Sequence, residues 1–312
     1  MAKPVLIDTD TGVDDALALI FALRSPELSI KAITTVAGNV EVQKCTRNVQ
    51  TILDLVWKGR AIEVTQGSAK PLRRRLTTAP EVHGSDGLGN SQKGPVPRRR
   101  AGISATERIA RVCDEFGKRL TIVALGPLTN IARAIVKSPA SMRKVGRIIS
   151  MGGAFRVPGN TGPVAEFNYY VDPEAADIVL QSGIPIRIVP LDLTEQIVLM
   201  RTELEYRARR RSNDVSRFIL RMTRFYMAYH KRTEGFNGGF LHDPVALAVA
   251  IDPGLFTMQR TLVRVETKGS MTRGMTIAES RRTRVSKRNQ VEVAVRIDRT
   301  RFLTLFHQRL WA

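Results

Sequence analysis

The sequence is poor in cysteine and has no long apolar segment. Cys45 and Cys113 are the two cysteines among 312 residues, and both fall in segments with a helical pattern. Two cysteines in a chain of this length do not form a disulfide framework, so a reducing compartment is the simplest setting. No apolar run approaches the roughly 18–20 residues that span a bilayer, and the opening MAKPVLIDTD lacks the apolar stretch of a signal peptide. We therefore expect a soluble, cytoplasmic protein that does not associate with membranes.

Acidic and aromatic residues are also scarce. The chain has 49 Lys and Arg against 29 Asp and Glu, which gives a formal net charge of +20, and aromatic residues make up 6%. The basic residues cluster at 70–75, 98–100, 207–211 and 281–288. Such charge can attract nucleic acid through counterion release, but no aromatic residues interleave the clusters as a platform for single strands requires. We interpret the clusters as solvated surface and expect no nucleic-acid partner.

The first 200 residues alternate short apolar runs with segments of helical periodicity. The apolar runs lie at 5–10, 29–38, 62–67, 120–126, 147–153 and 186–192, and the helical segments at 14–24, 41–57, 104–117, 129–137 and 174–182. This alternation is typical of βαβ units, which build a parallel sheet covered by helices on both faces. The predicted fold class is α/β, with an open, mostly parallel Rossmann-like sheet.

The rest of the chain departs from this rhythm. Residues 68–103 are rich in Pro, Gly and Arg, and a loop of that length is usually functional or disordered. After residue 200 the pattern is helical at 202–232 and 243–251, becomes β-like at 260–298 and ends in an amphipathic helix at 299–310. The β-like stretch predicts a small antiparallel extension near the C-terminus. Because no repeat or linker interrupts the chain, we predict a single domain over residues 1–312.

The strongest local motif is DTDTGVDD (8–15), which places four aspartates where the first strand meets a helix: Asp8, Asp10, Asp14 and Asp15. In open parallel sheets, ligands bind at the carboxyl ends of the strands. Four carboxylates this close repel one another, and a helix N-terminus offsets only about 0.3–1 kcal/mol for each. A bound divalent cation would relieve far more, and carboxylate oxygens select a hard metal such as Mg²⁺ or Ca²⁺.

Taken alone, this motif also looks like the opening of haloacid-dehalogenase-type phosphatases. In that alternative Asp8 would be the nucleophile and Asp10 its acid/base partner. A third alternative is a non-catalytic protein that binds nucleic acid through its basic surface.

Further polar residues follow later strands or sit in Gly- and Pro-rich loops. Asn39 follows the second strand, LGPLTN (125–130) follows another, and GNTGPVAEFN (159–168) contributes Asn160, Glu166 and Asn168. Asn and Glu side chains offer donors or acceptors on small planar groups, which suit vicinal hydroxyls. Several such residues at strand ends therefore favour a sugar as the ligand.

Five motifs together resemble the inosine-uridine-preferring nucleoside hydrolases. They are DTDTGVDDA (8–16), VAGN (36–39), LGPLTN (125–130), AEFN (165–168) and HDP (242–244). They come in that family's order with similar spacing, and the resemblance covers about residues 4–250 with a weaker continuation. It implies a nucleoside hydrolase fold and hydrolysis of the N-glycosidic bond of ribonucleosides to ribose and free base.

The resemblance also implies a metal site and a catalytic base. Its Ca²⁺ ligands would be Asp10, Asp15, the backbone carbonyl of Leu125, and Asp243. Asp10 would in addition take a proton from the attacking water, and the transition state would resemble an oxocarbenium ion.

The remaining implied roles concern the substrate. The ribose hydroxyls would be held by Asp14, Asn39, Asn160, Glu166 and Asn168. His242 would be the general acid for the leaving base, and His83 would reach the pocket from the long loop. Tyr226 and His230, four residues apart and thus on one helical face, would border the base, with Met151 and Phe167 as apolar walls. Tyr229 falls on another face, which favours core packing. The family resemblance further implies a homodimer or homotetramer.

Overall fold

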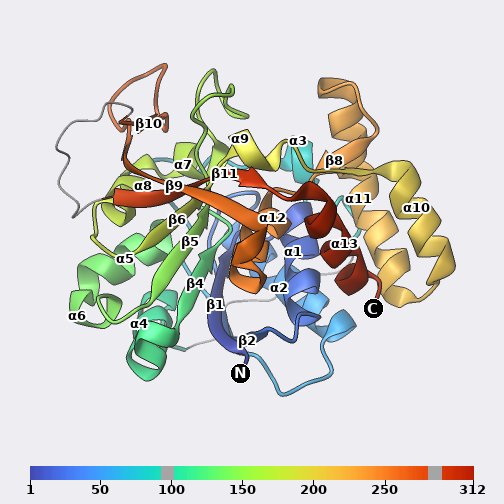
Figure 1. Ribbon diagram of the computed structural model, residues 1–312, viewed down its shortest axis with the longest axis horizontal. Helices are drawn as coiled ribbons and strands as arrows, with labels where there is room; N and C mark the ends of the chain where they lie inside the picture. The colour runs from blue at the N-terminus through green and yellow to red at the C-terminus, as the bar shows by residue number, and fades with distance from the viewer. Residues whose placement is uncertain (93–101, 280–289) are drawn as a thin grey trace.

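The computed structural model describes residues 1–92, 102–279 and 290–312, and its centre is a nine-stranded sheet with helices on both faces (Figure 1). The strands, in sheet order, are β10 (Thr276–Ala278), β9 (Phe256–Val265), β11 (Gln290–Ile297), β6 (Ile186–Val189), β5 (Arg147–Met151), β4 (Thr121–Ala124), β1 (Lys3–Thr9), β2 (Leu28–Thr35) and β3 (Val64–Gln66). The strands from β11 to β3 are all parallel, whereas β9 and β10 pair antiparallel at one edge. The mostly parallel sheet and its antiparallel extension are confirmed.

The order β3-β2-β1-β4-β5-β6 places β1 between β2 and β4, where the strand order reverses direction. The chain runs outward from β1 to β2 on one side and later returns to pair β4 with β1 on the other. The connections after β1 and β4 therefore diverge to opposite faces and leave a crevice at the carboxyl ends of these strands. Asp10 and Leu125 follow these two strand ends directly.

The strands bury both faces, which explains why their sequences are continuously apolar. Val5 and Ile7 of β1 pack into one hydrophobic cluster, and Leu6 between them packs into the other. The first cluster is covered by α1 (Val13–Leu23), α2 (Val42–Val56), α12 (His242–Ile251) and α13 (Arg299–Leu310), and the second by α4 (Ala105–Phe116), α5 (Thr129–Lys137), α6 (Pro139–Met142) and α8 (Pro173–Leu180). Cys45 and Cys113 are buried and free in α2 and α4.

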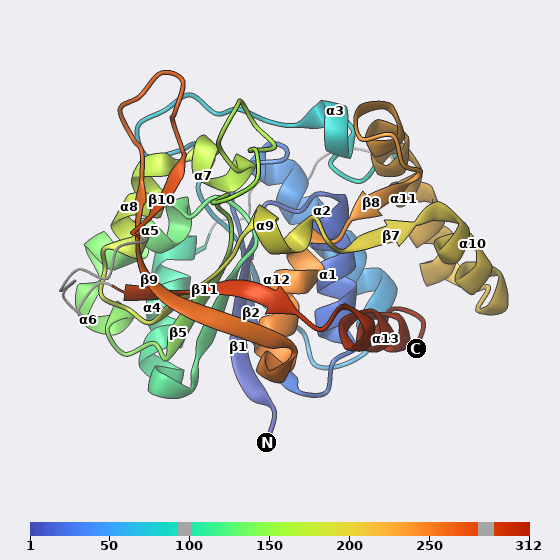
Figure 2. The same ribbon diagram turned by 45° about the horizontal axis from the view of Figure 1, so that its top comes forward.

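The segment 202–232, for which the sequence predicts one or two helices, forms two. α10 (Arg201–Arg210) and α11 (Asp214–Thr233) lie side by side at one end of the molecule (Figure 2). The break has a local cause, because Asn213 caps α11: its Oδ1 accepts from the N–H of Ser216 at 2.9 Å, and Ser216 Oγ accepts from the N–H of Asn213 at 2.9 Å. A two-stranded sheet of β7 (Val198–Met200) and β8 (Gly238–Phe240), which the sequence did not predict, joins the ends of this helical unit.

Short elements connect the longer ones. α3 (Pro80–His83), α7 (Phe167–Val171) and α9 (Leu191–Thr194) lie at the carboxyl end of the main sheet (Figure 2), whereas η1 (Gly117–Arg119) directly precedes β4 and η2 (Pro253–Leu255) follows α12. The predicted strands 120–126, 147–153 and 186–192 end two or three residues early, because the chain leaves the sheet there to form the site. Among the described residues, no helix is both long and apolar enough to cross a membrane.

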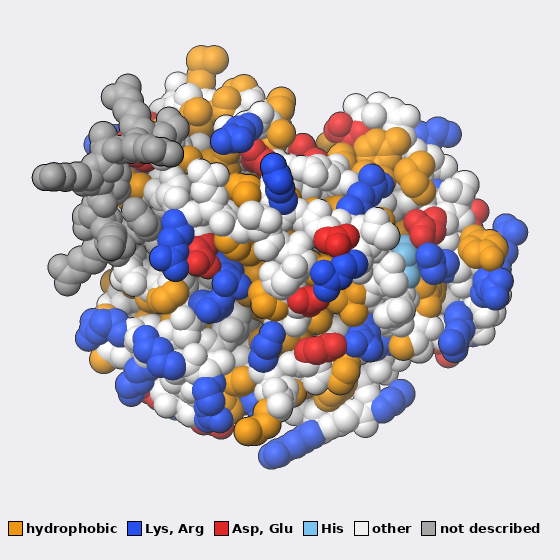
Figure 3. Space-filling view, viewed as in Figure 1, with side chains coloured by type: hydrophobic (Ala, Val, Ile, Leu, Met, Phe, Trp, Pro, Cys, Tyr) orange, Lys and Arg blue, Asp and Glu red, His pale blue; other side chains and the backbone are white. Residues whose placement is uncertain are grey.

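Basic side chains are spread over the visible face of the molecule rather than gathered at one place (Figure 3). The predicted basic clusters at 98–100 and 281–288 lie outside the described residues.

Candidate active site

Three buried carboxyl groups meet where α1 and α12 begin. Asp14 and Asp15 lie in the first turn of α1 and Asp243 in the first turn of α12, and one oxygen of each lies within 4.8 Å of the other two. Asp15 is held in place by three donors: Thr9 Oγ1 at 2.5 Å, the Gly12 N–H at 2.8 Å and Asn39 Nδ2 at 3.1 Å. Helix N-termini offer partial positive charge to these acids, but three carboxyls still share one small space.

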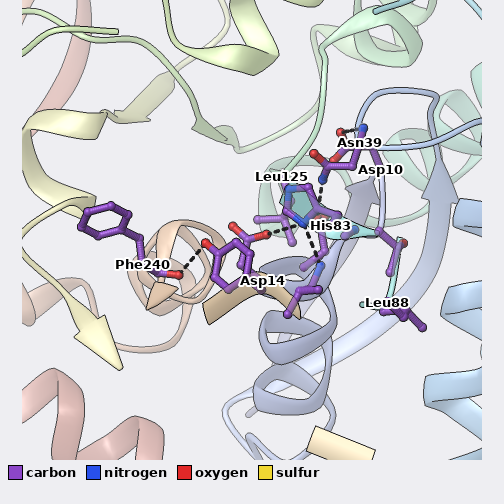
Figure 4. Close-up of polar contacts among 12 residues, drawn as sticks. Asp10, Asp14, Asn39, His83, Leu88, Leu125 and Phe240 are labelled. Atoms are coloured by element: carbon purple, nitrogen blue, oxygen red, sulfur yellow. Dashed lines mark hydrogen bonds and ion pairs between the residues drawn. The ribbon is translucent and has the colours of Figure 1, made fainter. Parts of the chain in front are cut away.

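Asp10 lies beside this trio at the end of β1. Its Oδ2 accepts from the backbone N–H of Asn39 at 2.8 Å, and its Oδ1 is buried with no hydrogen-bond partner among the described residues (Figure 4). The backbone passes tightly around it, since a Cβ on Gly38 would lie 2.0 Å from Oδ2 and one on Gly126 would lie 2.7 Å from Oδ1. The carboxylate is therefore fixed in direction, with one oxygen left for a ligand.

Burial raises the pKa of every acid in this group and is the largest cause for each. The charge of Asp15 adds to the effect of burial at the other three: the pKa of Asp10 and of Asp243 lies well above the usual value, and that of Asp14 is about 8. The charge of Asp10 also reaches Asp243, which places all four acids in one electrostatic cluster. A divalent cation is the natural partner for such a cluster.

Two of these acids, Asp14 and Asp243, line a cavity of about 680 Å³. The chain carries 49 Lys and Arg, yet no described residue that lines the cavity is one of them. Its charged lining is instead acidic: Asp14, Glu81, Glu166, Glu195, Glu234 and Asp243. No side-chain cation of the lining can neutralise the acidic cluster, so the donor set and the unpartnered Oδ1 of Asp10 both fit a bound metal ion.

Amide and carboxyl side chains from three loops border the acids. Asn39 donates its side-chain N–H to Asp15 at 3.1 Å, and Asn168 donates to the carbonyl of Leu125 at 2.8 Å. Glu166 caps α7 by accepting from the N–H groups of Asn168 and Tyr169, and also accepts from Gly153. Leu125, Asn39, Glu166 and Asn168 line the cavity and form a polar wall suited to hydroxyl groups.

Asn160, Phe167 and Met151 complete this side of the cavity. Asn160 is exposed, and its Oδ1 accepts from the N–H of Phe167 at 2.9 Å. Phe167 is half-buried and Met151 is buried, and both line the cavity. The predicted apolar walls are thus in place, while Asn160 stands at the rim.

Aromatic and histidine rings form the opposite side. Tyr226 stacks on His83, with ring centroids 5.6 Å apart, and meets His230 edge-on at 4.4 Å. Phe240 lies between His230 and His242, at 5.1 and 5.3 Å. This wall is large and flat, which suits a planar heterocycle.

The long loop 68–103 brings His83 into the site. Asp86 organises the loop after α3 by accepting from the N–H groups of Leu88, Asn90 and Gln92. Gly89 has a φ of +65° and lies so close to α11 that a Cβ would come within 2.1 Å of the carbonyl of Met222. His83 is consequently buried rather than a solvated loop histidine, and it faces Asp14 (Figure 4).

His242 does not cap the helix that it begins. Its Nδ1 lies 2.7 Å from Thr194 Oγ1 at the end of α9, and the ring lines the cavity. Burial, with His230 and His83 nearby, lowers the pKa of His242 to about 3, so the ring is neutral at pH 7.

Comparisons with known proteins agree with this arrangement. The profile described as inosine-uridine preferring nucleoside hydrolase matches residues 5–304. The chain belongs to the inosine-uridine preferring nucleoside hydrolase family. It is 43% identical over 312 residues, 99% of each chain, to the pyrimidine-specific ribonucleoside hydrolase RihA of Salmonella enteritidis PT4 (strain P125109).

Solved structures of nucleoside hydrolases share the fold over the whole chain. The plant nucleoside hydrolase PpNRh1 has a TM-score of 0.93 and 38% identity, with 100% of both chains covered. The purine-preferring ribonucleoside hydrolase from Gardnerella vaginalis has a TM-score of 0.91 and 35% identity, covering 99% of this chain and 98% of its own. This nucleoside hydrolase therefore hydrolyses the N-glycosidic bond of ribonucleosides, and enzymes of the family depend on a metal.

The two alternatives from sequence receive no support. The carboxyl of Asp8, the nucleophile in the phosphatase alternative, is engaged with neighbouring side chains: its Oδ1 accepts from Thr34 Oγ1 at 2.5 Å and from Asn130 Nδ2 at 2.8 Å. The family also identifies an enzyme rather than a non-catalytic nucleic-acid-binding protein.

The prediction for Tyr229 was wrong. It is half-buried and lines the cavity instead of packing in the core, because it adjoins His230 on the arc of α11 that borders the nucleoside hydrolase site. The sequence analysis also missed Thr194, Glu195 and Phe240. No local motif marks these residues, which reach the site only through the packing of α9 and β8 against α11 and α12.

Proposed function

We propose that this nucleoside hydrolase uses Ca²⁺, held by Asp10, Asp15, the carbonyl of Leu125, and Asp243. The buried acid cluster, with an unpartnered Asp10 oxygen and no lining Lys or Arg among the described residues, carries the proposal. An all-oxygen donor set suits Ca²⁺, which accepts more and looser ligands than Mg²⁺. When bound, the ion would hold the ribose diol and lower the pKa of a water molecule. Asp14, which clusters with Asp15 and Asp243, would face the ribose next to the bound ion.

Asp10 would be the catalytic base. The Asn39 N–H fixes one oxygen at 2.8 Å, which leaves Oδ1 to accept a proton from the attacking water. A base held by its own backbone surroundings loses little entropy when the substrate binds, so the water can be aimed at the anomeric carbon.

The polar wall would bind the ribose. Asp14 and Asn39 lie on the acid side, Glu166 and Asn168 on the other, and Asn160 at the rim. As the glycosidic bond breaks, positive charge spreads over the ring oxygen and the anomeric carbon. A carboxylate-rich pocket stabilises that charge more than the neutral ground state, which is the differential binding that accelerates a reaction.

His242 would protonate the leaving base. The ring is neutral at rest, since its pKa is about 3. Negative charge that develops on the departing base would raise this pKa and draw a proton to the ring for transfer. Thr194 orients the imidazole for this role through the 2.7 Å bond to Nδ1. His83, Tyr226 and His230 would border the base.

We further propose a pyrimidine ribonucleoside as the substrate. The relative at 43% identity is named for pyrimidine specificity, whereas the purine-preferring relative is 35% identical. A homodimer or homotetramer and a cytoplasmic location stay predictions.

The test is ribose release from uridine, cytidine, inosine and adenosine by the wild type, by Asp10→Asn and by Asp54→Asn. Asp54 is exposed on α2 and serves as the matched control. We expect the pyrimidine nucleosides to react fastest, Asp10→Asn to lower kcat about 10³-fold, and Asp54→Asn to behave as the wild type. Full activity in Asp10→Asn would refute its role as the base, and a preference for inosine would refute the pyrimidine assignment.

A further inference from the structure

A half-buried carboxyl without a partner stands in the wall of the cavity. Glu195 follows Thr194 at the end of α9 and lines the same cavity as His242. Its side chain makes no hydrogen bond or ion pair with any described residue. Its charged neighbours are themselves acids, Glu234 and Asp192, which together with burial raise the pKa of Glu195 to about 7. An unpaired carboxyl group in a pocket raises the free energy of the folded state unless a ligand donates a hydrogen bond to it.

The rings near Glu195 add more acceptors than donors. His230 Nδ1 lies 2.9 Å from the carbonyl of Tyr226 and must carry the proton that it donates there, so its Nε2 holds a lone pair. The Tyr226 hydroxyl donates to the carbonyl of Phe240 at 3.0 Å, which leaves its oxygen as an acceptor. His83 is the exception. Its Nδ1 accepts from the Val13 N–H at 3.1 Å, so Nε2 carries a proton.

A pyrimidine base presents one edge to this wall. Its C4 substituent lies across the ring from N1, so it points away from the ribose and toward the outer part of the cavity. Cytosine carries an amino group at this position, which donates two hydrogen bonds. Uracil carries a carbonyl oxygen there, which an ionised carboxylate repels and leaves unpaired.

We propose that Glu195 selects bases with an exocyclic amino group, so that cytidine is preferred over uridine. The inference rests on the proposed pyrimidine ribonucleoside hydrolase function and assigns the specificity within it. Glu195 accepts from the amino group of the base, while Glu234 acts only through its charge at the exposed rim.

The test compares kcat/KM for cytidine and uridine at about pH 8.5, where Glu195 is ionised because its pKa is about 7. The wild type should favour cytidine about 10-fold, in keeping with one hydrogen bond to a charged group. Glu195→Gln should bring the ratio close to one, because an amide can donate to the uracil oxygen as well as accept. Glu115→Gln, an exposed residue on α4, makes the same charge change outside the cavity and should leave the ratio unchanged.

Glu234→Gln distinguishes a direct contact between Glu195 and the base from the effect of negative charge at the rim of the cavity. If it shifts the ratio as much as Glu195→Gln, the selection is a property of the acidic rim and the proposal is wrong. It is equally wrong if Glu195→Gln slows both nucleosides alike or if the wild type prefers uridine.

A binding measurement keeps this test independent of catalysis. The ratio of Kd values for cytidine and uridine is measured by calorimetry on Asp10→Asn protein, with and without Glu195→Gln. Absence of ribose release by the wild type refutes the proposed function, whereas an unaltered Kd ratio refutes the assignment of Glu195.

Discussion

Asp8 and Asp10 show how position alone separates two like residues. Asp8 is the last-but-one residue of β1, and Thr34 and Asn130 use its carboxyl to tie β1 to its neighbours. Asp10 lies just past the strand, where the backbone has turned out of the sheet; its Oδ2 accepts from the N–H of Asn39, and the charges of Asp15 and Asp14 reach it. Each of the two carboxyls has one oxygen without a hydrogen-bond partner among the described residues, Oδ2 of Asp8 and Oδ1 of Asp10. Both are fully buried, so their opposite uses follow from what surrounds each carboxyl rather than from burial.

Gly38 and Gly126 are required by the Asp10 carboxylate that they enclose. We predict that Gly38→Ala lowers kcat/KM at least about 100-fold, because the new methyl group would lie 2.0 Å from Oδ2 and 2.8 Å from Pro127 and must displace the base. Ribose release measures the effect, and circular dichroism checks that the variant is folded. Gly102→Ala, where a Cβ meets nothing within 4 Å, is the control. Wild-type kinetics in Gly38→Ala would mean that the position of Asp10 is not critical.

At the scale of elements, the site depends on helices that begin at it. α1 and α12 both start at the acid cluster, with Asp14, Asp15 and Asp243 in their first turns. α11 instead passes along the site and presents Tyr226, His230 and, at the edge, Tyr229. The first arrangement is visible in the sequence, because carboxylates before an apolar helix form a local motif. The position of α11 is not visible in the sequence, because more than one face of a long amphipathic helix can pack against the rest of the protein.

α13 contributes a titratable contact of its own. Buried His307 accepts from Trp311 Nε1 at its Nδ1, 3.4 Å away, and its Nε2 lies 2.9 Å from Glu203 Oε1 of α10. The bond from Trp311 requires an unprotonated Nδ1, and therefore a neutral ring that carries its proton on Nε2. Burial lowers the pKa of His307 to about 4, although the charge of Glu203 opposes the shift.

The pH dependence of stability follows from this shift. Because the folded-state pKa lies below the unfolded value, the contribution of His307 is fully present above about pH 6.5 and is lost as the pH falls toward 4. Between pH 7.5 and 5.0 we expect it to lower the free energy of unfolding by about 2 kcal/mol, at 1.36 kcal/mol per pH unit below 6.5. Urea denaturation of the wild type and His307→Gln at both values measures this difference. An equal acid-induced loss in both proteins would contradict the prediction.

At the scale of the whole molecule, charge is segregated between surface and cavity. The chain carries a net charge of +20, with basic side chains over its outer face (Figure 3), while the described lining of the cavity has only acidic charges. Long-range attraction by the surface therefore says little about what the cavity binds. The buried acids come from elements distant in the sequence, and a cation bound by them, as proposed, would link these elements.

Metal binding should therefore stabilise the whole fold. We predict that Ca²⁺ at about 100 times its Kd raises the Tm of chelator-treated protein by about 5 °C, because binding to the folded state adds about 2.7 kcal/mol. Differential scanning fluorimetry measures the shift, and excess chelator should reverse it. Asp243→Asn should abolish most of the gain, and Mg²⁺ should give less than Ca²⁺, since it demands a tighter octahedral shell. An unchanged Tm in the wild type would count against the metal site.

The α/β order and the acidic motif at the first strand end were determined by the sequence alone, because both are local. Apolar runs alternate with helical periods, and 8–15 places carboxylates at a strand end whatever happens elsewhere. Family resemblance extended this to Asn39, Glu166, Asn168 and Asp243, each within a recognisable motif.

Only the tertiary structure decided which groups share the cavity without belonging to a motif. Glu195 and Phe240 line it because α9 packs beside α12 and β8 beside α11, and Thr194 contacts the His242 ring that lines it. Tyr229 lines the cavity next to His230. These relations arise from contacts between segments far apart along the chain, and neither periodicity nor spacing within one segment encodes them. Acidic side chains line the cavity and basic side chains cover the surface for the same reason. Composition gives the sum of the charges, and folding decides where each charged side chain lies.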